Sequence, residues 1–154
     1  MLMMVKLIKY IKKMGLDISC YNVGFRAGSY SYFNNFRNWV AMLSGITALE
    51  NMEGFGGIEK WNGKLCRHLL NHSDCDGRIP PRFAKVLLKD LLEVKNRWGI
   101  WKNLRDKGMD FSLFDNKFGK DWKYDEEGGF EDSLDEWIRV CNDSVDNDTY
   151  IEFG

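Results

Sequence analysis

The most chemically dense run of the chain is residues 71–79, which hold a histidine, two aspartates, a cysteine and an arginine around one glycine. Asp74 and Asp76 alternate before Gly77, as acidic ligands do before the sharp turn of a calcium loop. The register fails, because the first ligand position falls on His72 and the twelfth, which requires a bidentate glutamate, is a phenylalanine. We interpret the two aspartates as caps of local backbone N–H groups and Gly77 as a residue with positive φ.

A zinc site is an alternative use of the same region. His68 and His72 stand four residues apart, on one face of a helix, and Cys75 follows three residues later. Histidine nitrogen and cysteine sulfur are common zinc ligands, so these three side chains could coordinate zinc, whereas Cys66 would point away from them. His72 and its acidic neighbours would also suit general acid–base chemistry, but no nucleophile with matching spacing is visible.

A second polar cluster occupies residues 25–32, immediately before an expected helix. Arg26 offers a planar pair of donors, Ser29 offers a capping hydroxyl, and Tyr30 stands among three aromatic rings. A helix N-terminus with these groups favours an anion, although the segment lacks the spacing of a phosphate-binding P-loop.

We expect the two clusters to lie close together and to form one ligand site. Their polar groups would be costly to bury unpaired, and a bond from Arg26 to Asp74 or Asp76 would satisfy them, contributing ~1–3 kcal/mol. The predicted ligand-binding residues are Arg26, Ser29, Tyr30, Asp74, Asp76 and Arg78.

The elements that must position these residues follow from periodicity. Alternating apolar and polar residues predict strands over residues 16–21 and 149–153, which would pair in one small sheet. Residues 24–28 are expected to form a turn, with Ser29 or Ser31 as a helix cap. Helical stripes predict four principal helices, over residues 32–43, 58–71, 81–98 and 131–145.

The third of these helices begins at a double proline, which the first turn tolerates. Its inward stripe is expected to contain Phe83, Val86, Leu87, Leu91 and Val94, with Asp90 as the polar residue on the same stripe. The whole pattern predicts an α+β fold with four helices packed on a sheet that joins the two ends of the chain.

Length and composition set the limits of this interpretation. The chain has 154 residues, 44% hydrophobic and 29% charged, which suits one globular domain. We expect a basic extension over residues 1–13 and a single α+β domain over residues 14–154. No uncharged apolar stretch approaches the length of a membrane span. Four scattered cysteines, without a CxxC pair, indicate reduced thiols and a cytoplasmic protein.

Charge is distributed unevenly around a net value of −1. The first thirteen residues hold four lysines and no acid, whereas residues 121–154 hold twelve acidic and two basic residues. An acidic C-terminal third argues against binding to duplex nucleic acid. These acids are interpreted as a solvated helix face and tail, or alternatively as a surface that mimics nucleic acid and occupies a protein's binding channel.

Three motifs carry a resemblance to a known group of proteins. Gly15–Ser19 reads GLDIS, Phe25–Ser31 reads FRAGSYS, and Ser73–Gly77 reads SDCDG, followed by an Ala-Lys-x-Leu-x-x-Asp helix. With the tryptophan-bearing last helix and short terminal strand, the chain resembles a family of uncharacterised small bacteriophage and prophage proteins. The resemblance implies a shared origin and fold rather than a particular chemistry, and residues 80–81 and 121–136 depart from it.

The functional hypothesis is a phage-type accessory binding protein of the host cytoplasm, active in counter-defence, that sequesters a nucleotide-like anion or signal molecule. It would need no cofactor, and a homo-oligomer is compatible with it. One alternative is a metal-dependent phosphodiesterase-like enzyme in which His72, Asp74 and Asp76 hold a metal or move a proton. Another is an inhibitor that binds a host protein through its acidic surface. The absence of a triad, P-loop or complete ligand set favours binding over catalysis.

Overall fold

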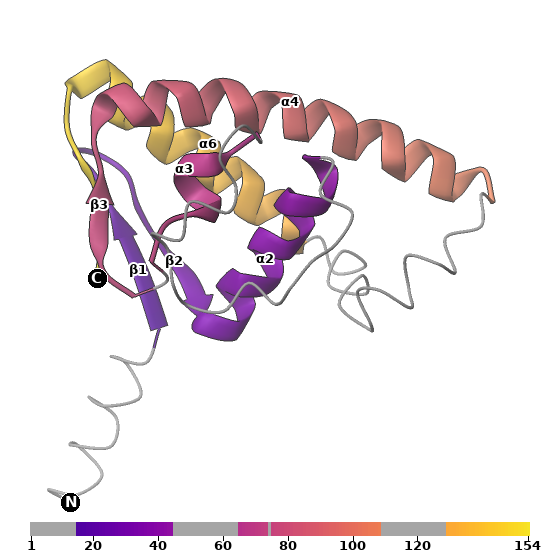
Figure 1. Cartoon of the computed structure of the whole chain (residues 1–154), viewed down its shortest axis with the longest axis horizontal. Helices are drawn as coiled ribbons and strands as arrows, with labels where there is room; N and C mark the ends of the chain where they lie inside the picture. The colour runs from indigo at the N-terminus through magenta and orange to yellow at the C-terminus, as the bar shows by residue number, and fades with distance from the viewer. Residues whose placement is uncertain (1–14, 45–64, 74, 109–128) are drawn as a thin grey trace, which may run out of the picture.

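The computed structural model describes residues 15–44, 65–73, 75–108 and 129–154. In chain order they form β1 (Gly15–Ser19), β2 (Gly24–Ser29), α2 (Tyr30–Leu43), α3 (Arg67–Leu70), β3 (Gly77–Ile79), α4 (Pro81–Asp106), α6 (Gly129–Asn147) and β4 (Ile151–Phe153). Figure 1 shows a small sheet beside which the helices gather, with α4 running along the length of the molecule. The fold is α+β, as the sequence predicts.

The sheet has four antiparallel strands in the order β2-β1-β4-β3. The central pair joins the two ends of the described chain, with Ile18 of β1 opposite Phe153 of β4, so the predicted pairing is confirmed. Leu16 and Ile18 are buried, whereas Asp17 and Ser19, which alternate with them, are exposed. The sheet therefore packs against the helices with one face and presents polar residues on the other.

Strand β2 replaces the turn that the sequence predicts over residues 24–28. The turn prediction is wrong because hydrogen bonding to β1 holds this glycine-containing segment in an extended conformation. A register shift between Leu16 and Asp17 and a φ of +98° at Gly28 allow the irregular segment to pair. The pairing is tertiary, so local periodicity does not reveal it.

The long helices differ from prediction mainly in length. Ser29 caps α2, since its Oγ accepts a hydrogen bond from the N–H of Tyr32 at 3.1 Å. Helix α4 continues to Asp106, past the predicted end near Trp98, because Trp98 and Trp101 both turn inward and are buried. Helix α6 extends the predicted 131–145 segment at both ends.

The second predicted helix is represented by α3 alone. Within residues 65–71, the described part of that prediction, only Arg67–Leu70 is helical. The main-chain N–H of Asn71 bonds the carbonyl of Arg67 at 2.9 Å and closes this turn. The basic extension predicted over residues 1–13, and the rest of the helix predicted over 58–71, lie outside the described residues.

An aromatic core holds the helices to the sheet. Trp137 of α6 packs between the sheet and α2, with ring centroids 5.4 Å from Phe25 and 5.7 Å from Phe153. Farther along α2, Trp39 meets Trp98 of α4 in an edge-to-face contact at 5.5 Å. The rings of this core are Phe33, Phe36, Trp39, Trp98, Trp101, Phe130, Trp137 and Phe153.

A buried carboxylate ties the turn between β1 and β2 to helix α6. Oδ2 of Asp143 accepts hydrogen bonds from the main-chain N–H groups of Asn22 at 2.7 Å and Val23 at 2.9 Å. Its Oδ1 accepts a third from the side-chain amide of Asn147 at 2.9 Å. The side chain of Asp143 therefore accepts hydrogen bonds from two main-chain N–H groups of the turn.

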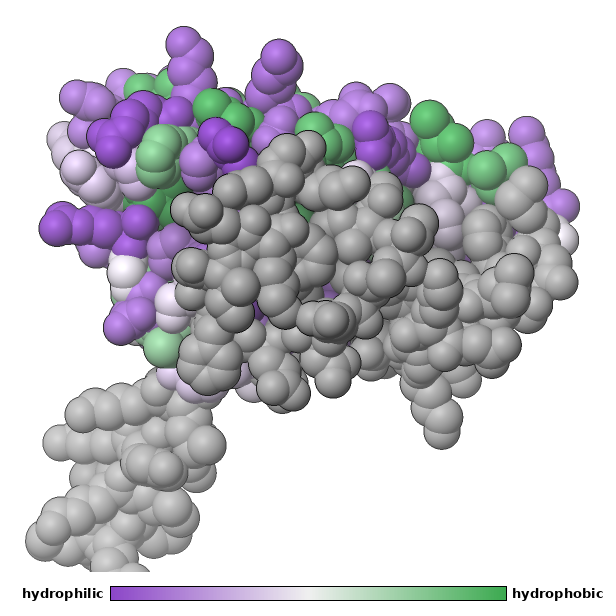
Figure 2. Space-filling view, viewed as in Figure 1, coloured by the Kyte–Doolittle hydropathy of each residue, from purple (hydrophilic) through white to green (hydrophobic). Residues whose placement is uncertain are grey.

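The surface above α4 mixes polar and apolar side chains. Figure 2 shows hydrophobic residues separated by hydrophilic ones along the upper edge of the molecule, where α4 lies. The exposed aliphatic residues of this helix are Val86, Leu92, Ile100 and Leu104. Within the described residues, no helix is both long enough and apolar enough to cross a bilayer.

Candidate functional site

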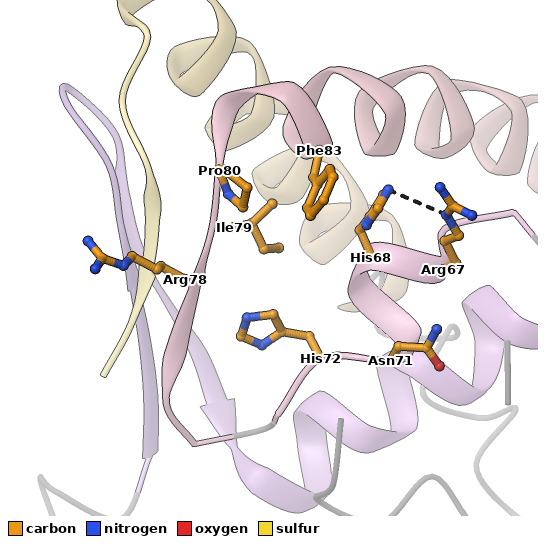
Figure 3. Close-up of a pocket in the computed structure, with 8 residues that line it drawn as sticks. All are labelled: Arg67, His68, Asn71, His72, Arg78, Ile79, Pro80 and Phe83. Atoms are coloured by element: carbon orange, nitrogen blue, oxygen red, sulfur yellow. Dashed lines mark hydrogen bonds between the residues drawn. The ribbon is translucent and has the colours of Figure 1, made fainter. Parts of the chain in front are cut away.

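A cleft of about 310 Å³ opens between α3, β3 and the first turn of α4. Figure 3 shows two parts of its lining. The apolar part comes from β3 and the start of α4, and the polar part comes from α3 and the two residues that follow it. The lining residues are Arg67, His68, Asn71, His72, Arg78, Ile79, Pro80 and Phe83. Among these described residues none is acidic, so the lining is basic and neutral in character.

The end of the cleft nearest the sheet is fixed by His72. Its imidazole stacks on Phe153 of β4 with centroids 3.8 Å apart, and Nδ1 donates a hydrogen bond to the carbonyl of Ser73 at 2.9 Å. The carbonyl of His72 itself accepts a 2.6 Å bond from Nη1 of Arg37, a side chain that is 1% exposed. These contacts hold the segment between α3 and β3 against the core.

Gly77 is required where this segment enters β3. Its φ is +96°, in the region that favours glycine. A Cβ at this position would also lie 3.2 Å from Cε1 of His72, so the imidazole occupies the space that a side chain would need. The expectation of a positive φ at Gly77 is therefore confirmed, and its cause includes the packing of His72.

The opposite wall is built around Phe83 and His68. Their rings stack with centroids 4.2 Å apart and an angle of 12° between planes. The Nε–H of Arg67 reaches Nε2 of His68 at 3.5 Å, which sets the guanidinium beside the imidazole at the rim. Arg67 is exposed, and it forms no ion pair with a carboxylate in the described part of the chain.

Burial keeps both histidines of the cleft neutral. The pKa of His68 is lowered from 6.5, first by burial and then by the charge of Arg67, while Asp90 opposes the shift. The pKa of His72 is also lowered, mainly by burial, with hydrogen bonds to the main chain and Asp76 acting in the other direction. At pH 7 the fixed positive charge of the lining therefore belongs to arginine.

The arrangement does not assemble a metal centre from the described residues. No group of three histidine, cysteine, aspartate or glutamate side chains converges there. Nδ1 of His72 is engaged with the Ser73 carbonyl, and Nε2 of His68 receives the contact from Arg67. Asp74, one of the residues of the predicted metal alternative, lies outside the described residues. The zinc arrangement of His68, His72 and Cys75 is therefore not formed.

The structure assigns other contacts to the residues predicted near β2. Arg26 lies on the exposed face of the sheet, and its Nη1 pairs with Oδ1 of Asp17 at 3.2 Å. Ser29 serves as the helix cap, and Tyr30, the first residue of α2, is exposed. None of these three residues lines the cleft.

Arg78 and Asp76 lie at the other side of the sheet. Arg78 contributes to the lining of the cleft, but Figure 3 shows its side chain pointing away from the cavity. Its guanidinium pairs with Glu152 at 3.9 Å and lies over the ring of Tyr150. Asp76 is exposed and near enough to raise the pKa of His72.

Within the described residues, which do not include Asp74, the predicted juxtaposition of the two polar clusters is wrong. Strands β2 and β3 form opposite edges of the sheet, and β1 and β4 lie between them. At ~4.8 Å per strand, the two edges are about 14 Å apart, beyond the reach of a salt bridge. Arg26 therefore has Asp17 as its carboxylate partner on the sheet, and the two clusters do not form one pocket.

Two residues of the predicted inward stripe of α4 are exposed in the structure. Phe83 and Val86 were expected to face inward, but they are 37% and 42% exposed, whereas Leu87 and Leu91 of the same stripe are fully buried. Arg67 and Asn71 received no role, although their four-residue spacing matches that of the two histidines and is a signal of a shared face. No protein-family model, curated protein or solved structure matches the chain.

Proposed function

We propose that the protein is a non-catalytic binding protein that sequesters a small anion, a nucleotide-like or other signal molecule, in the cleft between α3, β3 and α4. The observation that carries the proposal is the lining of this cleft. Within the residues that the structure describes, it combines an exposed guanidinium that pairs with no carboxylate and an apolar wall, and it contains no acid. The anchor of the ligand is therefore Arg67 rather than Arg26.

The chemistry of the rim favours an anion over a cation. Arg67 presents planar N–H donors that match a phosphate or carboxylate, and such charge-assisted bonds are about twice as strong as neutral ones. Arg82, in the first turn of α4, places a second guanidinium 4.7 Å over the ring of Phe83. A carboxylate-seeking cation would find no acidic partner in the described lining.

Binding without turnover accords with the fixed state of His72. A general base needs a ring nitrogen directed at the substrate, whereas Nδ1 of His72 donates to a main-chain carbonyl and its ring is stacked on Phe153. The phosphodiesterase alternative therefore gains no support from the described residues.

The alternative of an inhibitor that binds a host protein through its acidic surface is weakened by the ion pairs of α6. Glu131 and Asp135 bond Lys102 and Lys95 of α4 at 3.2 and 2.7 Å, so these acids are partly neutralised within the molecule. Sequestration of a signal molecule is an activity that suits a phage accessory protein, and we extend the proposal to a counter-defence role in the host cytoplasm on the resemblance of the sequence.

Calorimetric titration of the full chain tests the proposal. Inorganic phosphate, ribose 5-phosphate and nucleoside monophosphates serve as probes, with Arg67→Met as the variant and Arg78→Met as the matched control, because the Arg78 side chain points away from the cleft. We expect Arg67→Met to weaken binding about ten- to a hundredfold and Arg78→Met to leave it unchanged. Equal loss in both variants, or hydrolysis of a phosphodiester by the wild type, would overturn the proposal.

A further inference from the structure

We infer that the outer face of α4 is a docking surface for an anionic lipid bilayer, on which the protein lies peripherally without crossing it. The inference goes beyond the proposed function, because this surface is separate from the lining of the cleft. We call the surface the basic–aliphatic stripe. Its members are Arg82, Lys85, Val86, Lys89, Leu92 and Ile100.

The stripe lies on the side of α4 that faces away from the core. At ~100° per residue its six positions fall within about 120° of arc, and the buried residues of the helix lie on the opposite side. The three cations are exposed, and Val86, Leu92 and Ile100 are 42%, 51% and 55% exposed. At ~1.5 Å per residue the stripe is about 27 Å long. Figure 1 shows α4 along the upper edge of the molecule, where a planar partner can reach it.

The positive charge of the stripe is not neutralised within the described part of the chain. Its three cations form no ion pair there, whereas both acids of the same stretch of helix are engaged. Glu93 pairs with Arg97 at 3.0 Å. Asp90 accepts a hydrogen bond from the main-chain N–H of Cys66 at 3.0 Å. Anionic head groups attract such cations, and each Lys or Arg near the lipid surface strengthens partitioning about fivefold.

The aliphatic members of the stripe favour lipid over nucleic acid as the anionic partner. Binding to a single strand uses aromatic rings on which bases stack. The ring nearest the stripe, that of Phe83, is covered by His68 on one side and Arg82 on the other. The exposed aliphatic side chains gain nothing from a phosphate backbone, whereas at a bilayer they leave water for the boundary between head groups and acyl chains.

The spacing of the aliphatic residues favours a lipid surface over a protein partner. A stable protein interface has an apolar core from which charged residues are depleted. On α4 polar residues separate the aliphatic ones, as Figure 2 shows along the upper edge, and Leu92 stands between Lys89 and Asn96. A fluid bilayer accepts each side chain separately, because lysine and arginine stems lie along the apolar region while their charges stay among the head groups.

Vesicle flotation of the full chain tests the inference. The probes are vesicles of phosphatidylcholine alone, vesicles of phosphatidylcholine with phosphatidylserine, and a single-stranded oligonucleotide at the same salt concentration. We expect the protein to bind the anionic vesicles only, and less tightly as salt is raised. The double variant Lys85→Gln with Lys89→Gln should weaken this binding about thirtyfold. Leu92→Gln with Ile100→Gln should weaken it about tenfold, because the inserted apolar surface is lost.

The matched control is Arg26→Gln with Arg139→Gln, which removes two exposed cations from β2 and α6 and should weaken vesicle binding far less. Residues 1–13 hold four lysines of their own, so the stripe variants decide the result rather than wild-type binding alone. Vesicle binding that both stripe variants retain, or that the control loses equally, would overturn the inference. Oligonucleotide binding without vesicle binding would also overturn it and assign the stripe to nucleic acid. The affinity of the cleft for phosphate probes should be the same in the stripe variants as in the wild type, so this result is independent of the proposed function.

Discussion

Replacing Asp143 with alanine removes the acceptor of two main-chain N–H groups in the turn between β1 and β2. The donors are those of Asn22 and Val23, at 2.7 and 2.9 Å from Oδ2. A hydrogen bond to a charged group contributes ~1.5–3 kcal/mol, and water can replace part of this contribution because Asn22 is exposed and Val23 is half-buried. Because both bonds are lost together in a turn that water can reach, we expect the free energy of unfolding to fall by about 2–4 kcal/mol.

The same carboxylate should give stability a defined pH dependence. Burial alone would raise its pKa, but the hydrogen bonds from Val23, Asn22 and Asn147 outweigh burial and lower the pKa below the ordinary 3.8. A pKa lowered by folding means that the charged form stabilises the folded state at every pH above 3.8. This contribution should remain constant between pH 7 and 5 and should be lost as pH falls through the lowered pKa.

Urea unfolding followed by tryptophan fluorescence measures both effects. Asp146→Ala is the matched control, because Asp146 is an exposed residue of the same helix. We expect Asp143→Ala to lower the stability at pH 7 by several times more than Asp146→Ala does, and the difference between wild type and Asp143→Ala to shrink below pH 4. A loss of less than about 1 kcal/mol at pH 7 would refute the assignment of these bonds as the link between the turn and α6.

Two further predictions concern backbone strain and thiol reactivity. Gly77→Ala should lower the free energy of unfolding by about 1–3 kcal/mol because of the φ of +96°, whereas Gly99→Ala, in open space on α4, should not lower it; equal stabilities in thermal melts would contradict this. Burial raises the pKa of Cys66 well above 9.0 and that of Cys141 to about 12, so Ellman's reagent at pH 8 should modify exposed Cys75 and spare these two. Rapid labelling of Cys66 in the folded protein would count against its buried position.

The parts of the fold that are local in origin could be predicted from the sequence. Alternation over residues 16–21 and 149–153 is a local signal that survives in the sheet, and the hydroxyl of Ser29 caps a helix through a bond three residues away. Edge strands β2 and β3 could not be found in this way. Their glycines and short length give no period, and they become strands because β1 and β4 offer them hydrogen bonds.

The candidate site shows the same limit at the level of side chains. The sequence identified Arg78 as a ligand residue, but its side chain follows the alternation of a strand whose next residue, Ile79, is buried, so it points to the opposite face. Had the sequence indicated a strand over Gly77–Ile79, Arg78 would have been predicted to point away from the cleft. The cleft itself forms where α3 meets the start of α4, and no spacing along the chain connects Arg67 to Phe83.

The most direct test of the central claim is the ratio of dissociation constants for the tightest mononucleotide in Arg67→Met and Arg78→Met, measured by calorimetry on the full chain. Both substitutions remove one guanidinium near the same cleft, but only that of Arg67 stands at its rim. A cleft that binds anions through Arg67 predicts a ratio of about 10 to 100. A ratio of one, with wild-type affinity in both variants, would contradict the account and place the binding site elsewhere on the molecule.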